Sequence, residues 1–93
     1  MLVGKTVLIG FRYQNDGEQE PEEHKQWHGV IRAVTDRGID VRLEGTHAGE
    51  SKSLPPDLRV FHEAPPGEYI DRANGDTITD PDFIAAFRVS RDQ

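Results

Sequence analysis

The sequence contains no cysteine, which excludes disulfide bonds and metal sites built on thiolates. Aromatic residues are scarce at 8%, and the apolar share of 34% supports one compact core with little apolar surface to spare. No apolar run approaches the roughly 20 residues that a membrane-spanning helix needs. The first residues, Met1–Lys5, also lack the pattern of a secretory signal. These absences predict a small protein of the cytoplasm.

Charge is spread unevenly over the 93 residues, a length that suits one domain. The net charge is −6, and residues 14–26 and 64–82 each carry five acids and one base. Residues 27–63 are nearly balanced, with six acids and five bases. Solvated acids keep a small domain soluble, and they also suit a basic partner. Binding to a phosphate backbone is disfavoured because it needs clustered lysine and arginine.

Strict alternation of apolar and charged residues in Ile39–Glu44 predicts a strand with one buried face. The turn Asp36–Gly38 joins it to a second predicted strand at residues 27–35. Further strands are predicted at residues 5–13, 50–54 and 59–62, with a 3-10 turn at 56–58. Residues 15–26 contain no apolar residue and predict a long loop, with a short helix at 21–25 as an alternative.

The C-terminal third predicts a hairpin, because Asn74-Gly75 lies between the β-prone segments 68–72 and 76–79. Residues 83–89 fit a helix through the spacing of Phe83 and Phe87, but their short length and β-branched end favour a strand. We therefore predict an all-β single domain. It consists of a five-stranded small barrel over about residues 4–60 and a C-terminal hairpin and strand extension over about residues 64–93. The predicted core is Val7, Ile9, Phe11, Ile31, Ala33, Ile39, Val41, Leu43, Leu54, Leu58, Val60 and Phe87.

The sequence contains no clear catalytic or metal-binding pattern. His24 and His28 would share one side of a helix and could hold zinc there, but a strand that starts at Trp27 breaks this geometry. The serines lack the context of a nucleophile elbow, and the many acids lie in polar loops that do not shift a pKa. We expect no catalytic residue, no metal and no cofactor.

The most specific candidate for a binding site is a pair of aromatic residues at the two ends of the acidic loop, Tyr13 and Trp27. Such a pair at the mouth of a small barrel can hold a peptide or a cation, although Trp27 could instead close the end of the core. The neighbouring acids favour a cationic ligand. The candidate partner-binding residues are Tyr13, Glu20, Glu22, Glu23 and Trp27.

Arg32, Arg42 and Arg59 could form a local basic strip for nucleic acid, which many small barrels bind. Cross-strand pairing of Arg32 and Arg42 with Asp40 and Glu44 is the alternative.

The order of these segments resembles that of SH3-like and Tudor-like small barrels. The matching features are the opening Gly4–Phe11, the long first loop, His28–Ile31 before a tight turn, Ile39–Leu43, and the 3-10-like Leu54–Leu58. The resemblance covers about residues 4–60 and implies binding of an extended peptide or a methylated cation by aromatic residues. Residues 54–69 also resemble small bacterial proteins with no assigned activity.

The sequence thus predicts a non-enzymatic module that binds another protein or peptide, with a basic partner favoured. Two alternatives stay open: an immunity-type protein that neutralises a basic partner, and a nucleic-acid-binding barrel, which the charge disfavours.

Overall fold

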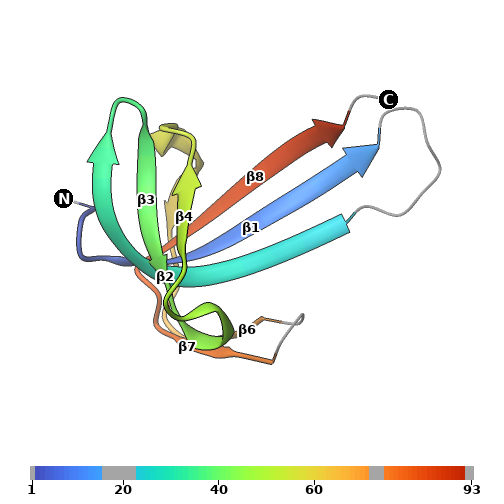
Figure 1. The fold of residues 1–93 in the computed structure, drawn as a ribbon. Helices are drawn as coiled ribbons and strands as arrows, with labels where there is room; N and C mark the ends of the chain where they lie inside the picture. Colours follow the sequence, from blue (N-terminus) through green and yellow to red (C-terminus); the bar gives the residue numbers. More distant parts are fainter. Residues whose placement is uncertain (1, 16–22, 72–74, 92–93) are drawn as a thin grey trace.

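The computed structural model describes residues 2–15, 23–71 and 75–91, and these form an all-β protein. The main sheet has six strands in the order β4-β3-β2-β1-β8-β5, and β6 and β7 form a separate two-stranded sheet (Figure 1). The strands are β1 (Thr6–Asn15), β2 (Glu23–Thr35), β3 (Gly38–Leu43), β4 (Ser51–Leu54), β5 (Phe61–Glu63), β6 (Glu68–Ile70), β7 (Thr77–Thr79) and β8 (Phe83–Arg91). Two 3-10 turns, η1 (Gly45–His47) and η2 (Leu58–Val60), complete the described chain, in which no helix could cross a membrane.

The period-two pattern of the sequence is realised in the central strands. Ile39, Val41 and Leu43 of β3 are buried, while the residues between them are exposed. Strand β2 begins at Glu23, four residues before the predicted start, because residues 23–26 pair with Gly10–Tyr13 of β1. Residues 23–25 are therefore extended and not helical, and residues 21–22 of the alternative helix lie outside the described residues.

The core lies on one face of the curled main sheet. Seven of the predicted core residues are buried: Val7, Ile9, Ile31, Ile39, Val41, Leu43 and Leu54. Phe11, Ala33, Val60 and Phe87 are only partly buried. The prediction for Leu58 was wrong, because its side chain in η2 is 52% exposed. Ala85, Leu8 and Ile78 are buried without having been predicted as core residues.

The C-terminal strand lies inside the main sheet, between β1 and β5 (Figure 1). It runs parallel to β1 along nine residue pairs, from Val7 opposite Phe83 to Asn15 opposite Arg91. It also pairs antiparallel with Phe61–Glu63 of β5. The preference for a strand at residues 83–89 is confirmed. The expected division into a barrel that is complete near residue 60 and an added extension is not what the pairing shows, since β8 supplies the neighbour of β1.

The expected five-stranded closed barrel is not found: the main sheet has six strands, because β8 joins it, and it is open, with β4 and β5 at its edges. The predicted hairpin is present, with Tyr69 of β6 opposite Ile78 of β7. Its connection is longer than the predicted Asn-Gly turn. The backbone N–H of Asp71 donates to Asp76 O, and that of Gly75, at φ +82°, donates to Asp71 O. Asn74 lies outside the described residues.

The outer halves of three strands project beyond the rest of the fold (Figure 1). Strand β3 pairs with β2 only from Gly29 onward, and β5 pairs with β8 only as far as Ala85. Residues 10–15, 23–28 and 86–91 therefore form a three-stranded projection, here called the ribbon. Its two faces carry different chemistry.

Candidate functional site

One face of the ribbon carries a line of half-buried aromatic rings, here called the aromatic stripe: Phe11, Tyr13, Trp27 and Phe87. The ring centroid of Phe11 lies 5.9 Å from that of Tyr13, 5.4 Å from that of Trp27 and 5.1 Å from that of Phe87. Phe11, Trp27 and Phe87 also pack against the buried core. The stripe thus continues the core outward along the ribbon, where it is only partly covered.

Lysines of the chain itself already occupy the cation positions over these rings. Lys52 of β4 places its Nζ 4.1 Å from the Trp27 ring centroid and 4.7 Å from that of Phe11. The Lys25 Nζ lies 5.8 Å from the Tyr13 centroid. A cation over an aromatic face at these distances is favourable. An external cation would therefore have to displace Lys52 from Trp27, whereas an apolar or aromatic group could lie along the stripe beside it.

The structure brings together two of the five candidate partner-binding residues. Tyr13 and Trp27 are linked through Phe11, and Trp27 both packs on the core and forms part of the stripe. Glu23 is opposite Tyr13 in the β1–β2 register, at the outer end of the ribbon. Glu20 and Glu22 lie outside the described residues. Alternation along the first predicted strand already puts Phe11 on the same face as Tyr13. The contributions of Phe87 and Lys52 were missed because only the sheet register reveals their neighbours.

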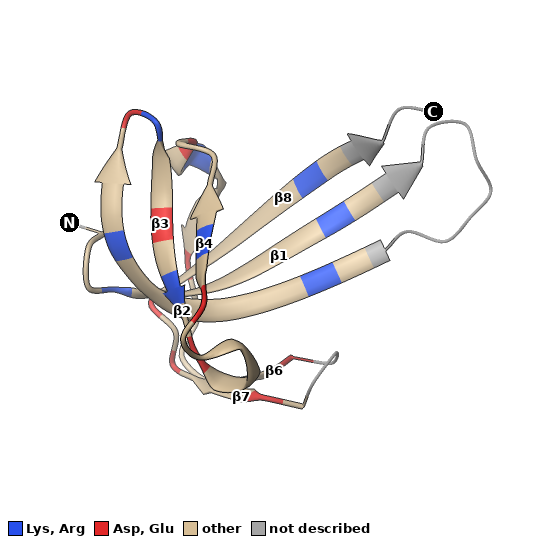
Figure 2. Cartoon of the chain, in the orientation of Figure 1, with Lys and Arg blue, Asp and Glu red and all other residues tan. Residues whose placement is uncertain are grey.

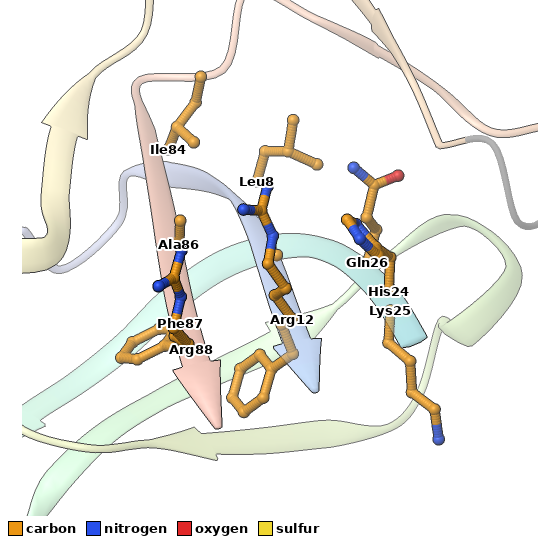
Figure 3. Close-up of a pocket in the computed structure, with 11 residues that line it drawn as sticks. Leu8, Arg12, His24, Lys25, Gln26, Ile84, Ala86, Phe87 and Arg88 are labelled. Atoms are coloured by element: carbon orange, nitrogen blue, oxygen red, sulfur yellow. The ribbon is translucent and has the colours of Figure 1, made fainter. Parts of the chain in front are cut away.

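The opposite face of the ribbon carries a basic row formed by Arg12, His24 and Arg88. In register, Arg12 of β1 is opposite His24 of β2 on one side and Arg88 of β8 on the other. Arginine and lysine bands cross all three strands of the ribbon at this level (Figure 2). The three side chains line a hollow of about 420 Å³ (Figure 3). Their separation in sequence, from 12 to 88, explains why no local pattern indicated the row.

The floor of this hollow is mainly apolar. Leu8, which is 8% exposed, Ile84 and Ala86 line it, and Gly10 contributes only backbone. Gln26 adds a neutral amide at the edge (Figure 3). Lys25 and Phe87 border the hollow, but their side chains lie on the other side of the strands from Arg12 (Figure 3). The hollow thus joins an apolar floor to three basic side chains.

The predicted strip of Arg32, Arg42 and Arg59 is only partly assembled. Arg32 and Arg42 line a second hollow, of about 580 Å³, together with Glu44. Arg59 instead forms an ion pair with Asp57, with Nε 2.9 Å from Oδ1, and the hydrogen bond from its side chain lowers the pKa of Asp57. The predicted alternative partner Asp40 accepts a hydrogen bond from the Ser53 hydroxyl at 3.0 Å.

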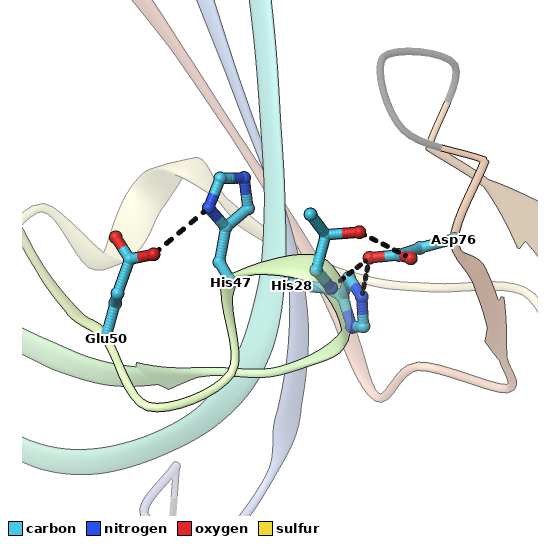
Figure 4. A network of polar contacts seen from close by, with 5 residues as sticks. His28, His47, Glu50 and Asp76 are labelled. Atoms are coloured by element: carbon cyan, nitrogen blue, oxygen red, sulfur yellow. Dashed lines mark hydrogen bonds and ion pairs between the residues drawn. The ribbon is translucent and has the colours of Figure 1, made fainter.

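Two histidines take part in polar contacts near the inner end of the ribbon, His28 in the middle of β2 and His47 in η1 (Figure 4). His28 Nε2 lies 3.3 Å from Asp76 Oδ2, and His47 Nδ1 lies 3.5 Å from Glu50 Oε2. Asp76 also accepts hydrogen bonds from the Thr46 backbone N–H at 2.8 Å and its hydroxyl at 3.0 Å. No group of three potential metal ligands occurs within residues 2–15, 23–71 and 75–91. His24 and His28 lie on one strand, about 13 Å apart by strand rise, which is too far to share a metal ion.

Two carboxylates, Asp76 and Asp82, connect the C-terminal third to the main part of the fold, and their hydrogen bonds lead us to expect that acid destabilises the fold. The Thr46 backbone N–H lowers the pKa of Asp76 below its ordinary value of 3.8, and the Thr6 backbone N–H, with its hydroxyl, does the same for Asp82. A pKa that is lower in the folded state means that the ionised form stabilises the fold. This stabilisation is present above about pH 4 and is lost as the pH falls through the folded-state values.

Asp76→Asn is therefore expected to be less stable than the natural chain at pH 7, with a smaller loss of stability between pH 4 and pH 2. Urea unfolding followed by Trp27 fluorescence at several pH values measures both effects. Asp36→Asn, in the exposed β2–β3 turn, removes an equal charge and should keep the natural pH slope. Identical slopes for Asp76→Asn and the natural chain would contradict the assignment.

Comparison with known proteins identifies no relative: no family model matches the chain, and no curated protein or solved structure is significantly similar to it.

Proposed function

We propose that this chain is a non-enzymatic module that binds an extended segment of another protein along the ribbon. The observation that carries the proposal is the aromatic stripe, which continues the core onto a projection that is only partly covered. Half-exposed aromatic residues gathered on one face are typical of binding surfaces, because they offer apolar area at a low cost in conformational entropy.

The open edges of the ribbon support an extended partner. Residues 23–27 of β2 have β1 on one side and no described strand on the other, because the pairing with β3 begins at Gly29. An extended peptide can add to such an edge through backbone hydrogen bonds, and its alternate side chains then face one side of the sheet. A peptide added at the β2 edge would thus place every second side chain on the face that carries the aromatic stripe, next to Trp27.

The acidic residues of the chain would attract basic residues of the partner that flank the bound segment, which agrees with the basic partner that the sequence favours. The candidate contact residues are thus Tyr13 and Trp27, with Glu20, Glu22 and Glu23 in the acidic segment that leads into β2. Because Lys52 fills the position over Trp27, the proposal favours an apolar or aromatic anchor on the stripe over a methylated cation. We retain a relation to SH3-like barrels in this proposal, since the sequence of residues 4–60 resembles theirs in the order of its segments.

Peptides selected from a random display library on the natural chain provide the test. Tyr13→Ala and Trp27→Ala are each expected to weaken binding of a selected peptide by about tenfold or more, because central aromatic anchors dominate such interfaces. Calorimetric titration measures the affinity. Tyr13→Ala is the more informative variant, since Tyr13 lies toward the tip of the ribbon, farther from the core than Trp27.

Ile70→Ala is the matched control, because it shortens an apolar side chain that is 63% exposed on β6. It should bind selected peptides like the natural chain. Circular dichroism of each variant checks that the fold is retained. If peptides bind equally well to Tyr13→Ala and to the natural chain, or lose affinity equally with Ile70→Ala, the stripe is not the binding surface.

A further inference from the structure

The basic row on the other face of the ribbon places like charges side by side. Arg12 and Arg88 are directly opposite in the parallel pairing of β1 and β8, where neighbouring strands lie about 4.8 Å apart. Like-charged residues in direct cross-strand positions destabilise a sheet. Both arginines are exposed, and in the part of the chain that the structure describes neither forms an ion pair.

The geometry of the row suits a single oxyanion. Two guanidinium groups on adjacent strands can both donate to one phosphate or carboxylate group, and such charge-assisted hydrogen bonds are among the strongest in proteins. His24 lies on the third strand, so that the row spans about 10 Å across the ribbon. The side chains of Arg12 and Arg88 lie on the same side of their strands as Leu8 and Ala86 (Figure 3).

The apolar floor of the hollow favours a ligand whose remaining part is apolar. Leu8, Ile84 and Ala86 offer apolar surface, and Gly10 leaves the middle of β1 without a side chain. A Cβ built at Gly10 would meet no atom within 4 Å, so the space above it is open. A ring or short apolar chain attached to the anionic group can therefore lie on this floor while the group reaches Arg12 and Arg88.

The overall charge favours a compact anion over a polymer. With a net charge of −6, the chain repels a long polyanion, whose affinity depends on many phosphate contacts. At physiological salt, charges more than about 8 Å away are largely screened, so the row still attracts one anionic group locally. The acids of the β6–β7 hairpin lie in a separate sheet, below the ribbon in the view of Figure 2, where Asp76 contacts His28 at the inner end of the ribbon.

We propose that the hollow bounded by Arg12, His24 and Arg88 binds a compact organic anion, with one phosphate or carboxylate group on the arginines and an apolar body over Leu8, Gly10 and Ile84. This site is independent of the proposed peptide surface, because it lies on the opposite face of the ribbon.

The test titrates the isotopically labelled full-length chain with inorganic phosphate, phenyl phosphate and benzoate and follows backbone amide shifts by NMR. Saturable shifts are expected at residues 10–12, 24–26 and 84–88. Inorganic phosphate should bind with a Kd on the order of 1 mM. Phenyl phosphate or benzoate should bind about tenfold more tightly through its ring. Comparing the two aromatic ligands tells whether the natural group is a phosphate or a carboxylate.

Arg12→Ala and Arg88→Ala should each weaken binding by about tenfold or more. Arg37→Ala is the matched control, because it removes one exposed positive charge from the β2–β3 turn and should leave binding unchanged. Gly10→Val fills the floor and should abolish the advantage of phenyl phosphate over inorganic phosphate while inorganic phosphate still binds. Far-UV circular dichroism confirms that each variant is folded.

Several results would overturn the proposal: no saturable shift with any of the three anions, equal weakening by Arg37→Ala, or shifts centred on Arg32 and Arg42. Tighter binding of a short oligothymidylate, with a steep dependence on salt, would also overturn it in favour of a nucleic-acid surface.

Discussion

Gly29→Ala is expected to lower the free energy of unfolding by about 3 kcal/mol or more, a large part of the stability of a domain of this size. Gly29 is buried in β2, between Val7 of β1 and Leu43 of β3. A Cβ there would lie 2.1 Å from the backbone oxygen of Arg42 and 2.9 Å from the Leu43 Cα. Since these are backbone atoms of a paired central strand, they cannot move aside without breaking the β2–β3 pairing.

Chemical denaturation of Gly29→Ala beside Gly10→Ala gives the decisive comparison. Both are strand glycines without a positive φ, but a Cβ at Gly10 meets nothing within 4 Å. Alanine restricts the unfolded chain more than glycine does, so Gly10→Ala should be neutral or more stable by about 0.5 kcal/mol. A Gly29→Ala protein as stable as Gly10→Ala would show that β2 and β3 are not packed as closely as described.

A chain that ends at Asp82 is expected not to fold cooperatively. It lacks β8, which is the neighbour of both β1 and β5. It also lacks Ala85, which is fully buried, and Phe83 and Phe87, which pack against the core. Removing a single buried Phe side chain costs about 3–5 kcal/mol, and a domain of this size has about 5–14 kcal/mol of stability. The open edge of β1 would in addition invite aggregation.

Amide NMR dispersion and urea unfolding of this shortened chain measure the effect. A synthetic peptide of residues 83–93 added in trans should restore dispersed signals, because it can occupy the vacant position between β1 and β5. A peptide of the same composition in scrambled order is the control. A shortened chain that unfolds in one sharp transition without the peptide would show instead that residues before β8 form an independent barrel.

The local sequence pattern was sufficient to predict those strands that have one buried and one exposed face. Ile39–Leu43 was predicted as a strand because its burial alternates with period two, and the buried Val7, Ile9 and Ile31 follow the same logic. Leu58 was misassigned because a 3-10 turn has no fixed inner face, and its exposure depends on how η2 lies against β8. The start of β2 was missed because the polar residues 23–26 extend only through their pairing with β1.

Some residues of the candidate sites could likewise be predicted from the sequence, and others could not. The aromatic residues Tyr13 and Trp27 are conspicuous in the sequence, but Lys52 over Trp27 depends on the register of β4 against β3. The basic row was out of reach, because Arg12 and Arg88 are 76 positions apart and meet only through a parallel pairing. Parallel neighbours lack the turn that makes antiparallel hairpins recognisable in a sequence.

By itself the sequence determined that the chain is all-β and which faces of its central strands are buried, because these properties depend on side-chain alternation within a few residues. Only the tertiary structure decided that β8 enters the sheet beside β1, that the ribbon projects, and that its two faces differ. Those features depend on register between distant strands, where one residue of slip moves every side chain to the other face.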